Sequence, residues 1–117
     1  MKLIHIADVH ANKNRKDVTI QMLNRLYKEC DERDIDYVLI SGDFWDCTVT
    51  NTSASGFTEI LNAMARLATY TKVIMIYGTP EHEPDGSLEI FKRIGCQVVD
   101  SFGILHLFGP NLDIITL

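Results

Sequence analysis

The stretch that decides the fold is Leu3-Ile4-His5-Ile6-Ala7-Asp8-Val9-His10, a short apolar run that ends in an acid and a histidine. The same pattern returns in Tyr37-Val38-Leu39-Ile40-Ser41-Gly42-Asp43-Phe44-Trp45-Asp46 and in Val73-Ile74-Met75-Ile76-Tyr77-Gly78-Thr79-Pro80-Glu81-His82-Glu83. Each run predicts a buried β-strand followed by a polar turn. If the strands are parallel, the three turns meet at one edge of the sheet, where such folds bind ligands. Carboxylates and imidazoles gathered there predict a metal site, because crowded charges are costly unless a cation neutralises them.

Two segments between these runs predict helices that cross from one parallel strand to the next. Apolar residues recur in them at helical spacing. They are Val18, Met22, Leu23, Leu26 and Tyr27 in the first, and Phe57, Ile60, Leu61, Met64, Leu67 and Ala68 in the second, where Ser53 and Ser55 are candidate caps. A short helix up to Ile94 and strands over 96–99, 104–107 and 112–115 are expected beyond Pro84. The sequence therefore predicts one α/β domain over residues 1–117, with a mainly parallel sheet flanked by helices.

The composition favours a single cytoplasmic domain. With 46% hydrophobic and 23% charged residues in 117 residues, the chain can bury one modest core. Its net charge of −5 argues against extended DNA binding by this chain alone. Cys30, Cys47 and Cys96 are irregularly spaced and odd in number, which is typical of reduced thiols. No apolar stretch approaches the roughly 18 residues of a membrane span, so no membrane association is expected.

Asp8 and His10 are the first candidate ligands, since they lie one residue apart at a strand end and can bind one metal. The alternative is that Asp8 caps a loop and His10 is merely exposed. Asp43 follows Gly42, whose missing side chain lets the turn bend tightly, and its carboxylate can bridge two cations. Asp46 has two open interpretations: a solvent-facing loop acid, or an acid that hydrogen-bonds a histidine and fixes its tautomer.

The three turns, in this order, resemble the motifs of the calcineurin-like metallophosphoesterases. That family has Asp-x-His, then Gly-Asp-x-x-Asp or His, then Gly-Asn-His-Asp or Glu, and the first two are matched by Asp8-Val9-His10 and by the turn from Gly42 to Asp46. The third departs, because Glu81 stands where the family has Asn and Thr79-Pro80 lengthen the turn. The opening and the second turn are most similar to the DNA-repair nuclease branch, the SbcD-like exonuclease subunits.

The resemblance also implies a fold. It covers nearly the whole chain but only the N-terminal half of the family's layered αββα sandwich. The family's later metal-binding motifs, a lone His and then Gly-His-x-His, are absent from this sequence. We therefore expect an incomplete metal shell, and a fragment that is inactive alone.

The resemblance implies roles for the third turn. His82 is the expected general acid, with Asp46 as its partner in the catalytic pair, because imidazole titrates near working pH. Glu81 takes the place of a metal-binding Asn, Thr79 is a weaker substitute ligand and Glu83 is expected to be structural. The implied chemistry is hydrolysis by a water activated between two metals. Oxygen and imidazole ligands without thiolate fit Mn²⁺ best, and iron or zinc also fit.

Other polar residues receive structural expectations. His5 lies inside the first strand and is expected to pack near the site or in the core. Lys13, Arg15 and Lys16 follow His10 and either attract a phosphate backbone or belong to a solvated loop. His106 lacks the Gly-His-x-His context and is not assigned to metal. The two aromatic side chains of the second turn are expected to pack beneath the metal loop; they are Phe44 and Trp45.

For partners, the resemblance implies DNA as substrate and an SbcC-like ATPase. Self-association is expected through the open strand edges of residues 104–107 and 112–115. Two alternatives remain open from the residues: a noncatalytic half-domain, and a phosphoacceptor signalling domain of the receiver class. That class has paired acids after its first strand, where this chain has Asp8-Val9-His10.

Overall fold

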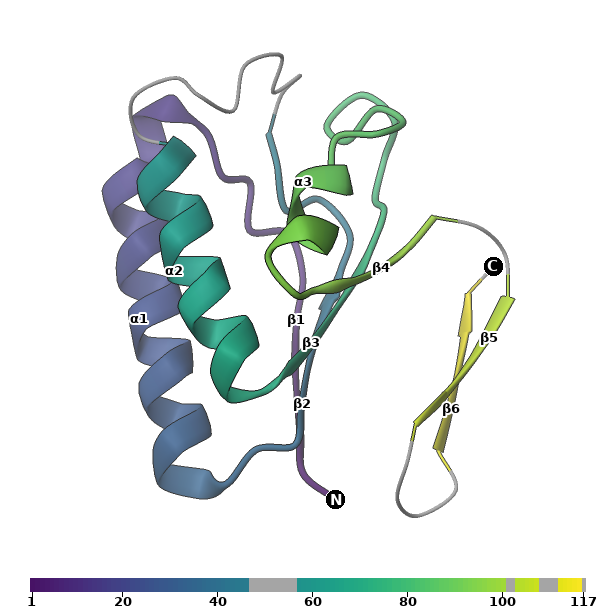
Figure 1. Cartoon of the computed structure of the whole chain (residues 1–117). Helices are drawn as coiled ribbons and strands as arrows, with labels where there is room; N and C mark the ends of the chain where they lie inside the picture. The colour runs from purple at the N-terminus through teal and green to yellow at the C-terminus, as the bar shows by residue number, and fades with distance from the viewer. Residues whose placement is uncertain (47–56, 101–102, 108–111, 117) are drawn as a thin grey trace.

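A computed structural model of the protein describes residues 1–46 and 57–100 in full, and the backbone of 103–107 and 112–116 (Figure 1). The elements are β1 (Leu3–Ile6), the 3-10 turn η1 (Lys13–Arg15), α1 (Lys16–Arg33), β2 (Tyr37–Ser41), α2 (Phe57–Tyr70), β3 (Lys72–Ile76), α3 (Glu89–Arg93), β4 (Gln97–Val99), β5 (Gly103–Leu107) and β6 (Leu112–Thr116). Among the described residues, no helix combines the length and the apolar character needed to cross a membrane.

Four strands form a parallel sheet in the order β1-β2-β3-β4. Ile4 pairs with Val38, which pairs in turn with Val73, so β1, β2 and β3 begin and end at similar levels in the sheet. The carboxyl ends of β1, β2 and β3 therefore share one edge, at the top in Figure 1. The predicted α/β fold, a mainly parallel sheet with crossover helices, is confirmed.

The main core lies between one face of this sheet and the helices. Alternate residues of β2 and β3 point to this face because side chains in a strand alternate. The buried residues that line it include Val38, Ile40, Val73 and Met75 from the strands and Leu23, Leu26, Ile60, Met64 and Leu67 from α1 and α2. In Figure 1, α1 and α2 run side by side along this face. A smaller apolar cluster, built around Tyr37 and Ile74, lies on the opposite face.

The late strands differ slightly from the sequence prediction. β4 begins at Gln97, one residue later than expected, and extends the parallel sheet beside β3. β5 and β6 form an antiparallel pair, in register from Gly103 with Thr116 to Leu107 with Leu112. The candidate caps Ser53 and Ser55, Cys47 and the side chain of His106 lie outside the described part of the chain.

The segment after the first turn is more ordered than a solvated loop. Asn12 caps η1 through its side chain, and Lys16 already begins α1. The Lys16 ammonium lies 3.5 Å from a carboxylate oxygen of Glu59 in α2. These residues therefore form the entry of a helix rather than a loop, while Lys13 and Arg15 are exposed to solvent as expected.

Candidate metal centre

The first two turns hold their backbones in left-handed conformations. Asp8, His10 and Asp43 have φ values of 54°, 51° and 52°, and Gly42 has 90°. Such values are uncommon outside glycine, and clusters of them occur at functional sites. The two turns are joined by hydrogen bonds from the Asp8 amide to the Gly42 carbonyl (3.1 Å) and from the His10 amide to the Asp43 carbonyl (3.0 Å). The bends thus place the side chains of both turns at one edge.

Glu83 ties the second turn to the third. Its side chain is buried, with 2% of the residue exposed. The carboxylate accepts four backbone N–H groups, from Asp43 (3.0 Å), Phe44 (2.6 Å), Trp45 (3.2 Å) and Gly78 (2.7 Å). A buried carboxylate is tolerated when hydrogen bonds replace its lost water. The expected structural role of Glu83 agrees with this geometry.

The carboxylate of Asp43 is held in place by the third turn. Thr79 donates to Asp43 Oδ1 from its amide (2.7 Å) and from its hydroxyl (3.0 Å). A Cβ on Gly78 would lie 2.1 Å from that oxygen and 2.3 Å from the Asp43 amide nitrogen. Only glycine fits at position 78 with the carboxylate in this place. Thr79 therefore contacts Asp43 itself, as the hydrogen-bond donor that orients it.

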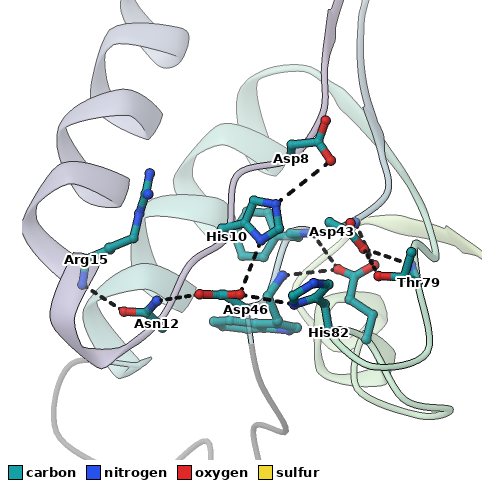
Figure 2. Close-up of polar contacts among 11 residues, drawn as sticks. Asp8, His10, Asn12, Arg15, Asp43, Asp46, Thr79 and His82 are labelled. Carbon is teal, nitrogen blue, oxygen red and sulfur yellow. Dashed lines mark hydrogen bonds and ion pairs between the residues drawn. The ribbon is translucent and has the colours of Figure 1, made fainter.

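Asp8, His10 and Asp43 form the first cluster of candidate ligands. One ligand atom from each lies within 4.8 Å of the others. The His10 Nε2 faces Asp8 Oδ1 at 4.0 Å, as Figure 2 shows. Two carboxylates and an imidazole are a donor set that suits a divalent cation, and the 71% exposed Asp8 side chain leaves the cluster open to solvent. The predicted ligands are thus brought together and fit a metal.

Asp46 forms a second cluster with two histidines (Figure 2). Its Oδ1 lies 3.0 Å from His82 Nδ1 and 3.3 Å from His10 Nδ1. The two imidazoles meet edge to face, with ring centroids 5.0 Å apart. Asn12 donates from Nδ2 to Asp46 Oδ2 at 3.0 Å. The Asn12 hydrogen bond lowers the pKa of Asp46 most, partial burial opposes this, and the two histidines lower it further.

The other residues singled out in the sequence differ in their burial and contacts. Glu81 is exposed and belongs to neither ligand cluster of the described residues, so its metal role stays a prediction. His5 is exposed, and its Nε2 contacts the Ser41 hydroxyl just before the second turn, so the core interpretation was wrong. Phe44 and Trp45 are 1% and 0% exposed, which confirms that they pack beneath the loop.

Two contacts were missed at the sequence level. Asn12 had no place in any motif, although an Asn before a helical segment is a cap signal. The link between His10 and Asp46 was also missed, because Asp46 was paired with His82 alone. No periodicity in the sequence marks contacts made across two turns.

The fold and the site together define an α/β domain whose parallel sheet gathers carboxylates and imidazoles, the donors of a candidate metal centre, at its carboxyl edge. The model of the calcineurin-like phosphoesterase family matches residues 1–115, and the chain belongs to that family.

Comparison with solved structures gives further likenesses, one of them to a nuclease. The fold is similar to the nuclease MPE of Pseudomonas putida, with a TM-score of 0.61 and 24% sequence identity, over 88% of this chain and 50% of the nuclease. The chain therefore spans half the length of that protein. Curated proteins yield no match.

Proposed function

We propose that the chain contributes metal ligands and a proton donor to a metal-dependent phosphodiesterase, a DNA nuclease of the SbcD-like branch. The observation that carries the proposal is the meeting of Asp8, His10 and Asp43 within 4.8 Å, beside the pair of Asp46 and His82. Family membership supports the phosphoesterase chemistry. The similarity of the first two turns to the nuclease branch supports the finer assignment.

Asp8, His10 and Asp43 would hold the first cation. Asp43 would share its carboxylate with a second, for which the exposed Glu81 is the next candidate ligand. Oxygen and imidazole donors favour Mn²⁺, and iron or zinc also fit. When bound, such metals lower the pKa of a water and stabilise the charge on a phosphoryl group.

His82 is proposed to deliver a proton to the departing oxygen. Asp46 takes up its Nδ1, which leaves Nε2 as the nitrogen that would carry the transferred proton in the imidazolium form. The His82 side chain is 38% exposed, so a substrate can reach it. A general acid of this type typically contributes about 10²- to 10⁴-fold to the rate.

The proposed substrate is DNA, with an SbcC-like ATPase as partner and the cytoplasm as location. A net charge of −5 disfavours DNA binding by this chain through broad electrostatics. We therefore assign most of the phosphate-backbone contacts to the partner. Self-association through the strands at 103–107 and 112–116 belongs to the same proposal, and Ile114→Lys tests it by light scattering over a dilution series.

Calorimetry with Mn²⁺ tests the metal site in residues 1–117. We expect micromolar to millimolar affinity that falls at least about tenfold in Asp43→Asn, a loss of ~1.4 kcal/mol in binding free energy. Asp85→Asn, at an exposed acid of the same region, is the matched control and should bind as the wild type does. Equal affinity in Asp43→Asn and the control would place the metal elsewhere.

Hydrolysis tests the chemistry. Residues 1–117 alone are expected to cleave a model phosphodiester or DNA poorly. A longer protein that contains them should be active on these substrates with Mn²⁺. There, His82→Ala should lower turnover about 100-fold with Mn²⁺ affinity nearly unchanged. A parallel loss of Mn²⁺ binding would make His82 a ligand instead, and no cleavage by the longer protein would support the noncatalytic half-domain.

A further inference from the structure

We propose that Asn12 is a positioning residue that holds Asp46 and, through it, fixes the orientation of both imidazoles of the site. The inference rests on the proposed function only in taking His10 as a ligand and His82 as the proton donor. The geometry itself involves no metal and no substrate.

Both ends of the Asn12 side-chain amide are used. Its Oδ1 accepts the backbone N–H groups of Asn14 (2.9 Å) and Arg15 (3.0 Å), which caps η1. Its Nδ2 donates to Asp46 Oδ2 at 3.0 Å. The cap fixes the amide plane, so the donor end points at Asp46 without free rotation. Aspartate would keep the cap but lacks the donor, and serine would keep the cap but is too short to reach.

The backbone reinforces the same contact. The Asp46 amide donates to the Ala11 carbonyl at 3.0 Å, and Ala11 forms an isolated parallel bridge with Trp45. Ala11 is fully buried and separates His10 from Asn12 in the sequence. The first turn thus carries the candidate metal ligand His10 and, two residues later, Asn12, which holds Asp46 beside His10.

Fixing Asp46 determines which nitrogen of each imidazole carries the proton. With Oδ2 occupied by Asn12, Oδ1 faces His82 Nδ1 at 3.0 Å and His10 Nδ1 at 3.3 Å. A carboxylate only accepts, so each neutral ring presents N–H at Nδ1 and keeps a lone pair at Nε2. The His10 Nε2 lone pair then lies on the side of Asp8, where the candidate ligand atoms converge. On His82, the Nε2 lone pair is the position that would take up the proton to be delivered.

The tautomers of His10 and His82 provide a direct test. Nitrogen NMR of metal-free residues 1–117, at a pH where both rings are neutral, should show Nδ1–H for both. His10→Gln and His82→Gln assign the signals. In Asn12→Ser, which keeps the cap, we expect both rings to become mixtures of tautomers and Mn²⁺ affinity to fall a few-fold. Asn14→Ser, at an exposed neighbour, is the matched control and should leave both unchanged.

The outcomes separate the Asn12 role from the proposed function. Wild-type tautomers in a folded Asn12→Ser would overturn the positioning role, whatever the metal does. Nδ1–H rings that respond to Asn12 in a chain that binds no Mn²⁺ would keep the role and defeat the metal proposal. If Asn12→Ser fails to fold, Asn12→Asp, which keeps the cap without the donor, is measured in the same way. There too, unchanged tautomers would overturn the role.

Discussion

The two edges of the parallel sheet are built in different ways. At the carboxyl edge, three residues other than glycine adopt positive φ, namely Asp8, His10 and Asp43. At the opposite edge only Asp34 does so among the described residues, where it ends α1 in an ordinary left-handed cap. A left-handed residue at a helix end affects only the turn that ends the helix. Left-handed residues in two facing turns direct their side chains towards one point. The difference indicates that the backbone of the carboxyl edge is shaped to assemble a functional site.

The polar contacts of the two edges also differ, because those at the carboxyl edge are more buried than those at the opposite edge. Glu83 reaches inward to four amides of two turns and is buried. At the opposite edge, Lys2 donates from its amide to Asp36 at 2.8 Å and from its ammonium to the Arg33 carbonyl at 2.8 Å, both at the surface. Exposed pairs of this kind contribute little to stability. Substitutions at the carboxyl edge should therefore cost more than those at the other.

The largest expected effect is at Glu83. In Glu83→Ala four backbone amides, two buried and two partly buried, lose their acceptor, and we expect a loss of about 3 kcal/mol or more in the free energy of unfolding. Urea denaturation measures it. Glu81→Ala, at an exposed acid two residues earlier, should change stability by no more than about 0.5 kcal/mol. Similar losses in both variants would show that the buried carboxylate is not what joins the turns.

A second effect is expected at Gly78. The new Cβ of Gly78→Ala would overlap the amide nitrogen and Oδ1 of Asp43, so the backbone must shift at a cost of about 1–3 kcal/mol. Because Asp43 moves with it, calorimetry should also show weaker Mn²⁺ binding. Gly86→Ala is the control: its φ of 87° brings strain, but no atom lies within 4 Å of the added group. The Mn²⁺ affinity of Gly86→Ala should therefore equal that of the wild type. A fall in Mn²⁺ affinity in both variants would contradict the role of Gly78.

The sequence predicted the three parallel strands because their apolar runs are long and end in turns with unusual residues. It also brought Asp8, His10, Asp43 and His82 to one edge, since the strand ends follow from the topology. It did not predict that Asp46 faces two histidines or that Asn12 holds it. Those contacts depend on left-handed bends and on the register between turns, which leave no periodic signal. The entry into α1 was missed for a related reason, because Asn12 was not recognised as a cap.

A smaller effect is expected at Asp34, the left-handed residue of the opposite edge. Its φ of 52° suits glycine, which has no Cβ to strain, although glycine also gains entropy when unfolded. In Asp34→Gly these terms nearly cancel, so urea denaturation should show a change within about 1 kcal/mol. Mn²⁺ affinity should equal that of the wild type. A loss of metal binding in this variant would contradict the separation of the two edges.

The smallest effect concerns the ionisation of Tyr70, at the end of α2 near the same edge. Its hydroxyl donates to Asp31 Oδ1 at 2.7 Å, and this hydrogen bond, with burial and the charge of Asp31, raises the pKa of Tyr70 from 10.0 to about 12. The unfolded chain therefore loses this proton first as pH rises. The contribution to stability is complete below about pH 10 and is lost as the pH rises towards 12.

Ultraviolet titration of tyrosinate, as the difference between the wild type and Tyr70→Phe, isolates this group among the four tyrosines. In Asp31→Asn the carboxylate charge is gone and the pKa of Tyr70 should return towards 10.0. Metal affinity should be the same in both proteins, since this pair belongs to the edge that carries no ligand cluster among the described residues. A Tyr70 that titrates normally in the wild type would mean that the Asp31 contact does not persist in solution. A change in Mn²⁺ binding would mean instead that the helix ends influence the opposite edge through the core between them.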